Sequence, residues 1–170
     1  MQPAPSFEDL MAATATSAVH LEMRDTYTPT DPEFVHWLAT GSITWSTADR
    51  EWYDLVRATV ARGVSIRRAR IASEPLADFI RFEFESTTDL NVAAGEDVRW
   101  LPRRQATDIA LPGNDFWVFD DRLVRINHFT GSGELLAGEI TDETAVLKLC
   151  ASAFEAVWER AIPHEEYQPR

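Results

Sequence analysis

The chain is poor in cysteine and in basic residues. Cys150 is the only cysteine among the 170 residues, which excludes an intramolecular disulfide bond. Its neighbours are apolar and follow a helical pattern, so we expect a buried and unreactive thiol. A formal net charge of −12 disfavours direct binding to nucleic acids and to anionic membranes, because both attract proteins through lysine and arginine. A protein partner or a small ligand suits this charge better.

Long apolar runs and familiar catalytic motifs are also missing. No run approaches the roughly 20 apolar residues that span a bilayer, and the first residues do not resemble a signal peptide, so we expect a cytoplasmic protein. No phosphate-binding loop or serine-nucleophile motif is present. The histidines are too scattered for metal-ligand spacing, so we expect neither a metal nor a cofactor; they are His20, His36, His128 and His164.

The chain is rich in apolar and aromatic residues, which make up 45% and 11% of it. This composition is typical of a packed core, and the length suits one domain. We therefore expect a flexible tail over residues 1–5, a single α/β domain over 6–165 and a C-terminal tail over 166–170.

Hydrophobic periodicity and capping residues predict the order of the elements. Residues 73–87 are ambiguous, because Pro75 favours a helix whereas Ile80, Phe82 and Phe84 alternate as in a strand; we favour the helix. The order predicts a single-domain α/β sandwich, a mixed β-sheet flanked by helices. The other expected helices span 6–15, 31–41, 46–63 and 141–163, and the strands span 18–25, 64–72 and 96–101, with three more within 113–140.

Four segments together resemble one half of a phospholipase D-like domain: "ARGVSIRRARI", "DVRWLP", "DFWVFDDRLVRI" and "FEAVWERAIP". The resemblance implies the fold of such a half and places Asp120 at the aspartate of the catalytic motif. Gly113 and Asp115 then stand where the histidine and lysine belong. A shift by one residue places Asn114 and Phe116 there, with Asp121 as the aspartate. That chemistry needs the histidine as nucleophile and the lysine as a charge clamp. The chain is therefore expected not to hydrolyse phosphodiesters.

A second resemblance extends over nearly the whole chain, through "HLEMRDTY", "WYDLVRATVARG", "RIASEPLADFIRFEFEST" and "NVAAGEDVRWLPR". These segments resemble an actinobacterial family of unknown function whose members are often encoded beside helix-turn-helix regulators. The resemblance implies a catalytically silent regulatory or ligand-sensing accessory domain. Its partner would be a protein, such as a transcriptional regulator, or a small molecule. The sequence leaves the oligomeric state open, and a homodimer is one alternative.

Polar residues within these segments form the candidate site. Glu22 and Arg24 alternate with the apolar Val19 and Leu21, so we expect them on a face open to a groove. A structural ion-pair network between neighbouring strands is the alternative. The candidate ligand-binding or partner-binding residues are Glu22, Arg24, Asp25, Tyr27, Arg81, Asn91, Glu96 and Arg99.

An enzyme on the same scaffold is the alternative function. It would process a small molecule with carboxylate and tyrosine side chains as acid and base, and the candidates are Glu22, Asp25, Tyr27 and Glu74. Such groups need shifted pKa values in a shared pocket. Perturbed carboxylates in one pocket would therefore favour an enzyme.

Overall fold

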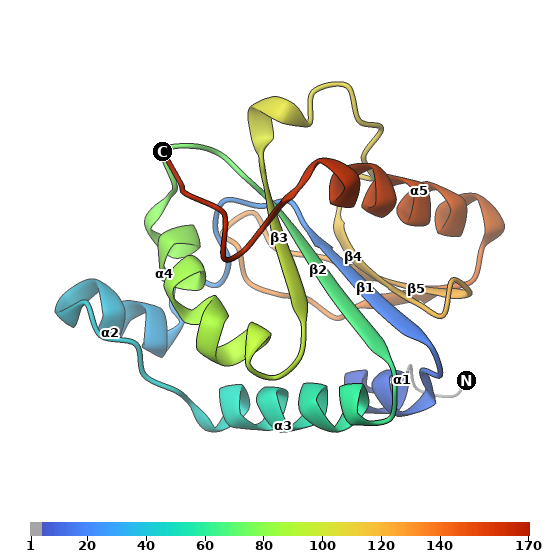
Figure 1. Ribbon diagram of the computed structural model, residues 1–170, viewed down its shortest axis with the longest axis horizontal. Helices are drawn as coiled ribbons and strands as arrows, with labels where there is room; N and C mark the ends of the chain where they lie inside the picture. The colour runs from blue at the N-terminus through green and yellow to red at the C-terminus, as the bar shows by residue number, and fades with distance from the viewer. Residues whose placement is uncertain (1–4) are drawn as a thin grey trace.

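A mixed seven-stranded sheet forms the centre of the molecule (Figure 1) in the computed structural model, which describes residues 5–170. Residues 1–4 of the expected N-terminal tail lie outside this range. The strands run β6-β5-β4-β1-β2-β3-β7 across the sheet. β1, β2 and β3 are parallel, and the other pairings are antiparallel. The strands are β1 (Ser17–Glu22), β2 (Ser65–Ala72), β3 (Asp97–Pro102), β4 (Asp115–Phe119), β5 (Leu123–Asn127), β6 (Glu139–Thr141) and β7 (Ile162–Pro163).

Helices cover both faces of this sheet. One face packs against α5 (Thr144–Arg160), and the other faces α1 (Phe7–Ala13), α2 (Pro32–Thr40), α3 (Thr47–Ala61) and α4 (Asp78–Thr87) (Figure 1). The predicted fold class, a mixed sheet flanked by helices, is thereby confirmed. Among residues 5–170, no helix is both long and apolar enough to cross a membrane.

Local capping signals explain where the helices begin. The Ser6 hydroxyl accepts a hydrogen bond from the Asp9 amide, and the Asp9 carboxylate accepts one from the Ser6 amide. Ser46 and Asp49 repeat this capping box at α3, and Asp31 caps α2 by accepting from the Phe34 amide. Each side chain satisfies backbone donors that a helix start leaves free. These three starts lie within one residue of those predicted.

Several boundaries differ from the expectation. The segment 73–87 does form a helix, but α4 begins only at Asp78, and Pro75 lies in the loop before it. A π-helical turn over Thr88–Val92 extends α4. The third strand of the 113–140 segment, β6, begins only at Glu139. A turn precedes it, closed by a single antiparallel bridge between Phe129 and Leu135. β7 was not predicted; its two residues are too few to show a periodicity.

β1 is buried on both faces, which corrects the expectation of one open face. His20 is 6% exposed and Glu22 is 9% exposed, although both point away from the side that holds Val19 and Leu21. The reason is the parallel pairing of β1 with β2, whose connection through α2 and α3 packs helices onto the polar face as well. β1 also ends at Glu22, so Arg24 and Asp25 lie in the following loop.

The segment after β7 returns to the sheet. Tyr167, within the expected C-terminal tail, is buried and stacks on Trp100 with ring centroids 5.5 Å apart. Its hydroxyl donates a hydrogen bond of 2.9 Å to Glu74. The C-terminus therefore lies near the start of α4 (Figure 1).

We expect Phe154→Ala to lower the free energy of unfolding by about 3 to 5 kcal/mol, because the side chain is fully buried between α5 and the sheet. Leu149→Ala is the matched control on the same helix, where the side chain is 42% exposed. Urea denaturation of both variants measures the difference. Equal losses would show that α5 does not pack as described.

Candidate functional site

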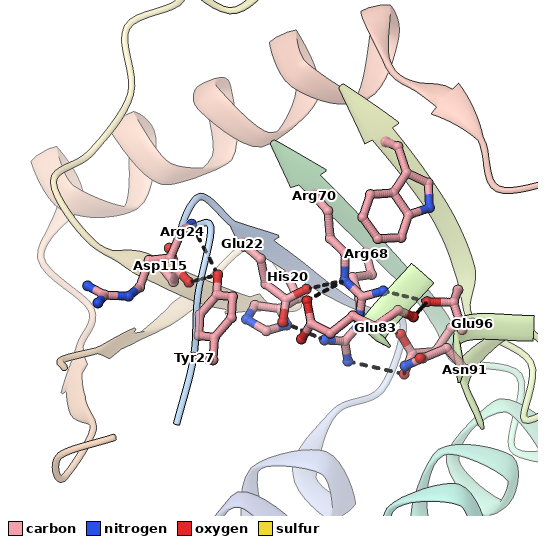
Figure 2. Close-up of polar contacts among 12 residues, drawn as sticks. His20, Glu22, Arg24, Tyr27, Arg68, Arg70, Glu83, Asn91, Glu96 and Asp115 are labelled. Atoms are coloured by element: carbon pink, nitrogen blue, oxygen red, sulfur yellow. Dashed lines mark hydrogen bonds and ion pairs between the residues drawn. The ribbon is translucent and has the colours of Figure 1, made fainter. Parts of the chain in front are cut away.

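A network of buried ion pairs lies on the sheet face that α3 and α4 cover (Figure 2). The strand register sets Glu22 of β1 opposite Arg70 of β2. Glu22 Oε1 accepts a hydrogen bond of 3.0 Å from Arg68 Nη1, and its Oε2 accepts one of 2.6 Å from Arg70 Nε. One carboxylate therefore joins two guanidinium groups.

The segment after α4 completes the network. Glu96 accepts hydrogen bonds of 2.7 and 3.2 Å from the Arg68 guanidinium. Asn91 Nδ2, from the π-helical turn, donates 3.0 Å to the same carboxylate. Arg70 Nη1 donates 2.6 Å to Thr87 Oγ1 at the end of α4. We call Glu22, Arg68, Arg70 and Glu96 the ion-pair network.

Mutual pairing keeps these groups charged although they are buried. Burial alone would raise the pKa of Glu22, but Arg70 and Arg68 hold it well below its usual value. Burial would likewise lower the pKa of Arg68, and the neighbouring Glu96 and Glu22 carboxylates raise it instead. Buried charges are tolerated only when they are paired in this way. The network therefore consists of two cations and two anions.

Two polar side chains beside the network have free hydrogen-bonding atoms. Both ring nitrogens of His20 and Oε2 of Glu83 are buried and have no hydrogen-bond partner within residues 5–170. The His20 ring stacks on Trp117 with centroids 4.2 Å apart. Glu83 Oε2 lies 4.0 Å from Arg70 Nε. An unsatisfied buried polar atom is costly and calls for an explanation.

Burial shifts the protonation of both groups towards the neutral form. It lowers the pKa of His20 well below its usual value, against the opposing effect of Glu22. It raises the pKa of Glu83 to about 8; Arg70 opposes this shift and Glu22 adds to it. At neutral pH His20 is therefore uncharged, and Glu83 carries its proton most of the time.

These groups face a pocket of about 370 Å³, within the range of small-molecule sites. The ion-pair residues Glu22, Arg68 and Arg70 line it from the sheet, and Glu83 and Asn91 line it from α4 and the turn after it. The rest of the wall includes the aromatic side chains Phe7, Trp45, Trp52, Phe79, Phe82 and Trp117.

The structure brings together only some of the predicted binding residues. Glu22 and Asn91 line the pocket, and Glu96 lies beside them in the network. Arg81 is exposed on α4. Arg99 lies on the opposite sheet face, 4.2 Å from the ring of Trp158. The predicted set therefore does not converge on one surface.

The loop after β1 holds the remaining candidates, apart from the network (Figure 2). The Tyr27 hydroxyl donates 2.5 Å to Asp115 Oδ2. Asp25 accepts hydrogen bonds of 2.8 and 2.7 Å from the amide and hydroxyl of Ser73, and the Arg24 guanidinium lies over the Phe129 ring. These contacts hold the loop in place.

The residues proposed for an enzyme, Glu22, Asp25, Tyr27 and Glu74, are not gathered in one pocket. Glu22 belongs to the network, and Glu74 accepts from Tyr167 near the C-terminus. The pocket instead offers His20 and Glu83, which the sequence reasoning missed. Arg68 was also not predicted as a site residue, although its position in the alternating pattern of β2 matches that of His20 and Glu22 in β1. No local pattern marked Glu83.

The two aspartates that the phospholipase D resemblance singles out have other contacts. Asp120 accepts hydrogen bonds from the amides of Ala15, Thr16 and Ser17 at 2.7 to 3.0 Å. Burial opposes ionisation of Asp120, but these bonds hold its pKa well below the usual value. Burial raises the pKa of Asp115 to about 6, against the hydrogen bond from Tyr27. Asp120 thus fixes the start of β1.

The single cysteine and the residue types that bind metal ions also bear on possible chemistry. Burial raises the pKa of the Cys150 thiol to about 11, so it is protonated at neutral pH and a poor nucleophile. Within residues 5–170, no three side chains of histidine, cysteine, aspartate or glutamate are grouped so that they could hold a metal ion. The pocket beside the ion-pair network therefore remains the principal candidate site.

Fold and site together define a single-domain α/β protein with a mixed sheet and one polar, aromatic-walled pocket beside a buried ion-pair network. The chain belongs to the family described as domain of unknown function DUF6879, whose sequence model matches residues 5–169. The expected membership of a family of unknown function is thereby confirmed. Comparison with curated proteins found no matching sequence.

Two solved structures are similar to this chain. One is Nuc from Salmonella typhimurium, a phospholipase D family member, with 12% identity and a TM-score of 0.48 over 92% of this chain and 86% of that one. The other is TrmBL2, an archaeal chromatin protein described with a novel mode of DNA binding. It has 13% identity and a TM-score of 0.49 over 91% of this chain and 47% of that one.

We expect Glu96→Gln to lower the free energy of unfolding by about 3 to 5 kcal/mol, because it leaves the buried Arg68 short of a counter-charge. The matched control is Glu155→Gln, which removes the partner of Arg67 at a side chain 60% exposed. An exposed pair contributes about 0 to 1 kcal/mol. Chemical denaturation of both variants tests the contrast, and similar losses would argue against the network.

The raised pKa of Glu83 predicts a pH dependence of stability. Between the ordinary value of 4.5 and about 8, the folded protein holds a proton that the unfolded chain has released. The stabilising contribution of Glu83 is thus fully present below about 4.5 and is lost as the pH rises to about 8. Glu83→Gln should therefore gain stability relative to the unmodified protein across this window.

Thermal or urea unfolding at several pH values measures that difference. Other titrating groups, His20 among them, are present in both proteins and largely cancel. Glu51→Gln, at an exposed position of α3, is the control for the loss of one carboxyl group. A flat difference for Glu83→Gln would mean that Glu83 titrates as an ordinary carboxyl group.

Proposed function

We propose that this protein is a catalytically silent, ligand-sensing accessory domain that binds a small molecule in the pocket beside the ion-pair network. The observation that carries this proposal is the set of free polar atoms at the pocket: the two ring nitrogens of His20 and Oε2 of Glu83. A ligand would give them the partners that the chain does not.

The energetics favour a binding site over a packing defect. A buried donor or acceptor without a partner costs about 1 to 3 kcal/mol, and here several such atoms adjoin one pocket. The network next to them is fully ionised and tightly bonded, so the pocket floor is rigid. Rigid polar groups beside aromatic walls are the usual composition of a small-molecule site.

The protein partner that we propose is a transcriptional regulator of the helix-turn-helix class. This part of the proposal rests on the resemblance to a family often encoded beside such regulators. The net charge of −12 supports a protein or small-molecule partner over direct contact with nucleic acid.

An enzyme acting on a small molecule is the second candidate function. It is favoured by Glu83, whose pKa of about 8 lets the carboxyl group donate or accept a proton near neutral pH. His20, on β1, faces the same pocket and is uncharged at neutral pH, so its ring could accept a proton. This pair would replace the set Glu22, Asp25, Tyr27 and Glu74 as acid and base.

The test is a fragment screen followed by nuclear magnetic resonance of the tryptophan indole N–H groups. Ligands that bind as proposed should shift the signals of Trp45, Trp52 and Trp117, which line the pocket. Trp158 packs in the core on the opposite sheet face and should not shift. Hits that move Trp158 alone, or a diverse screen without hits, would contradict the proposal. Turnover of a bound fragment that Glu83→Gln abolishes would favour the enzyme instead.

A further inference from the structure

The charges around the pocket are unequal in sign. Five carboxyl groups and three guanidinium groups line it. Glu22 is joined to Arg68 and Arg70, and Glu96 beside the pocket supplies the second anion for these two cations. The network is therefore neutral. Among the other lining groups, Arg125 is outnumbered by the carboxyl groups of Asp31, Glu33 and Asp49, and Glu83 adds a fourth carboxyl group that is mostly protonated at neutral pH.

The aromatic wall is only partly occupied by the chain's own cations. The Arg68 guanidinium lies 5.6 Å from the ring centroid of Trp52 and 5.5 Å from that of Trp117. Trp45, Phe79 and Phe82 line the same pocket. Aromatic faces attract organic cations and their apolar bodies. The wall near α4 therefore suits a ligand that combines an apolar body with a positive group.

Glu83 is the carboxyl group that would contact the positive group of the ligand. It extends from α4 beside Glu22 and Arg70 (Figure 2), and its free Oε2 is buried. Arg70 Nε lies 4.0 Å from this oxygen but donates its hydrogen bond to Glu22 at 2.6 Å. No donor within residues 5–170 bonds to Glu83 Oε2, so a donor on a ligand would be the first hydrogen-bond partner of this oxygen.

We propose, as a refinement that rests on the proposed function, that the pocket takes a small organic cation: a protonated amine on an aromatic or short apolar body. The ammonium group contacts Glu83, and the body packs against Phe79, Phe82 and Trp45. An ammonium group supplies hydrogen-bond donors and a positive charge to the buried Oε2 of Glu83.

Arg125 defines the orientation of this ligand. Its guanidinium lies over the Phe7 ring, 5.1 Å from the centroid, on the β5 side of the pocket. Burial lowers the pKa of Arg125, opposed by Glu8. The ammonium group therefore avoids this wall and lies towards α4.

Binding of a cation also moves a proton. Glu83 is mostly protonated at neutral pH, since burial raises its pKa to about 8. An ammonium group favours the carboxylate, so the Glu83 proton passes to the buffer on binding. Other charged or titratable groups face Glu83 or the same pocket from every side: His20, Glu22, Tyr27, Asp31, Glu33, Asp49, Arg68, Arg70, Asp115 and Arg125.

Three probes of one shape and different charge test the proposal: 2-phenylethylamine, 2-phenylethanol and 3-phenylpropanoate. The amine should bind at least about tenfold more tightly than the alcohol, a difference of about 1.4 kcal/mol, and the carboxylate should bind weakest. Titration calorimetry at neutral pH in two buffers of different ionisation enthalpy should show proton release with the amine alone. The tryptophan indole signals locate each probe.

Glu83→Gln should weaken the amine about tenfold or more and leave the alcohol unchanged. Glu51→Gln is the matched control, because it makes the same carboxyl-to-amide change at an exposed position outside the pocket wall. The indole spectrum of each variant confirms that it is folded.

The outcomes separate the two proposals. If the alcohol or the carboxylate binds in the pocket as well as the amine does, the cation proposal fails and the pocket remains a ligand site. If the amine binds Glu83→Gln unchanged, its contact with Glu83 is overturned. If no probe shifts the pocket indoles, the cation proposal fails, and a fragment screen without hits would remove the proposed function as well.

Discussion

The bridge that Glu22 makes between Arg68 and Arg70 is the interaction on which the rest of the structure depends. Three charges on two central strands cannot face an apolar layer unless other groups satisfy them. Thr87 at the end of α4 and Glu96 before β3 do so. The positions of α4 and of the π-helical turn are therefore tied to the register of β1 and β2, and the helices on this face must close over a polar layer.

The same pairing of charges distinguishes the residues that support the site from the residues that have atoms free to bind a ligand. The charges of the network neutralise one another, so its members gain little from contact with a ligand. Among residues 5–170, the buried polar atoms without a partner on this sheet face belong to His20 and Glu83 at the edge of the network. Burial is the main cause of the shifted protonation of these two groups.

Much of the fold could be predicted from the sequence, because caps and periodicities act between neighbours. Ser46 and Asp31 mark helix starts through residues three positions away. The site could be predicted only in part. Glu22, Asn91 and Glu96 were identified as candidates, but the partner of Glu22 lies 48 residues away in Arg70. The burial of His20 depends on a second layer of helices, and Glu83 is one of two glutamates on α4. Long-range packing, which has no local signature, made both of them site residues.

The contacts of Asp120 and Asp115 show what the residues at two positions of the resembled motif do in this fold. Asp120 serves three backbone amides, a role that needs only a carboxylate at the end of β4. Asp115, at the position that the resemblance assigns to lysine, bonds to Tyr27 and to the Met23 amide. A carboxyl group there would repel a phosphate once it ionises, above its pKa of about 6. The carboxyl group that has a free buried oxygen beside an aromatic wall is instead that of Glu83, in the pocket under α4.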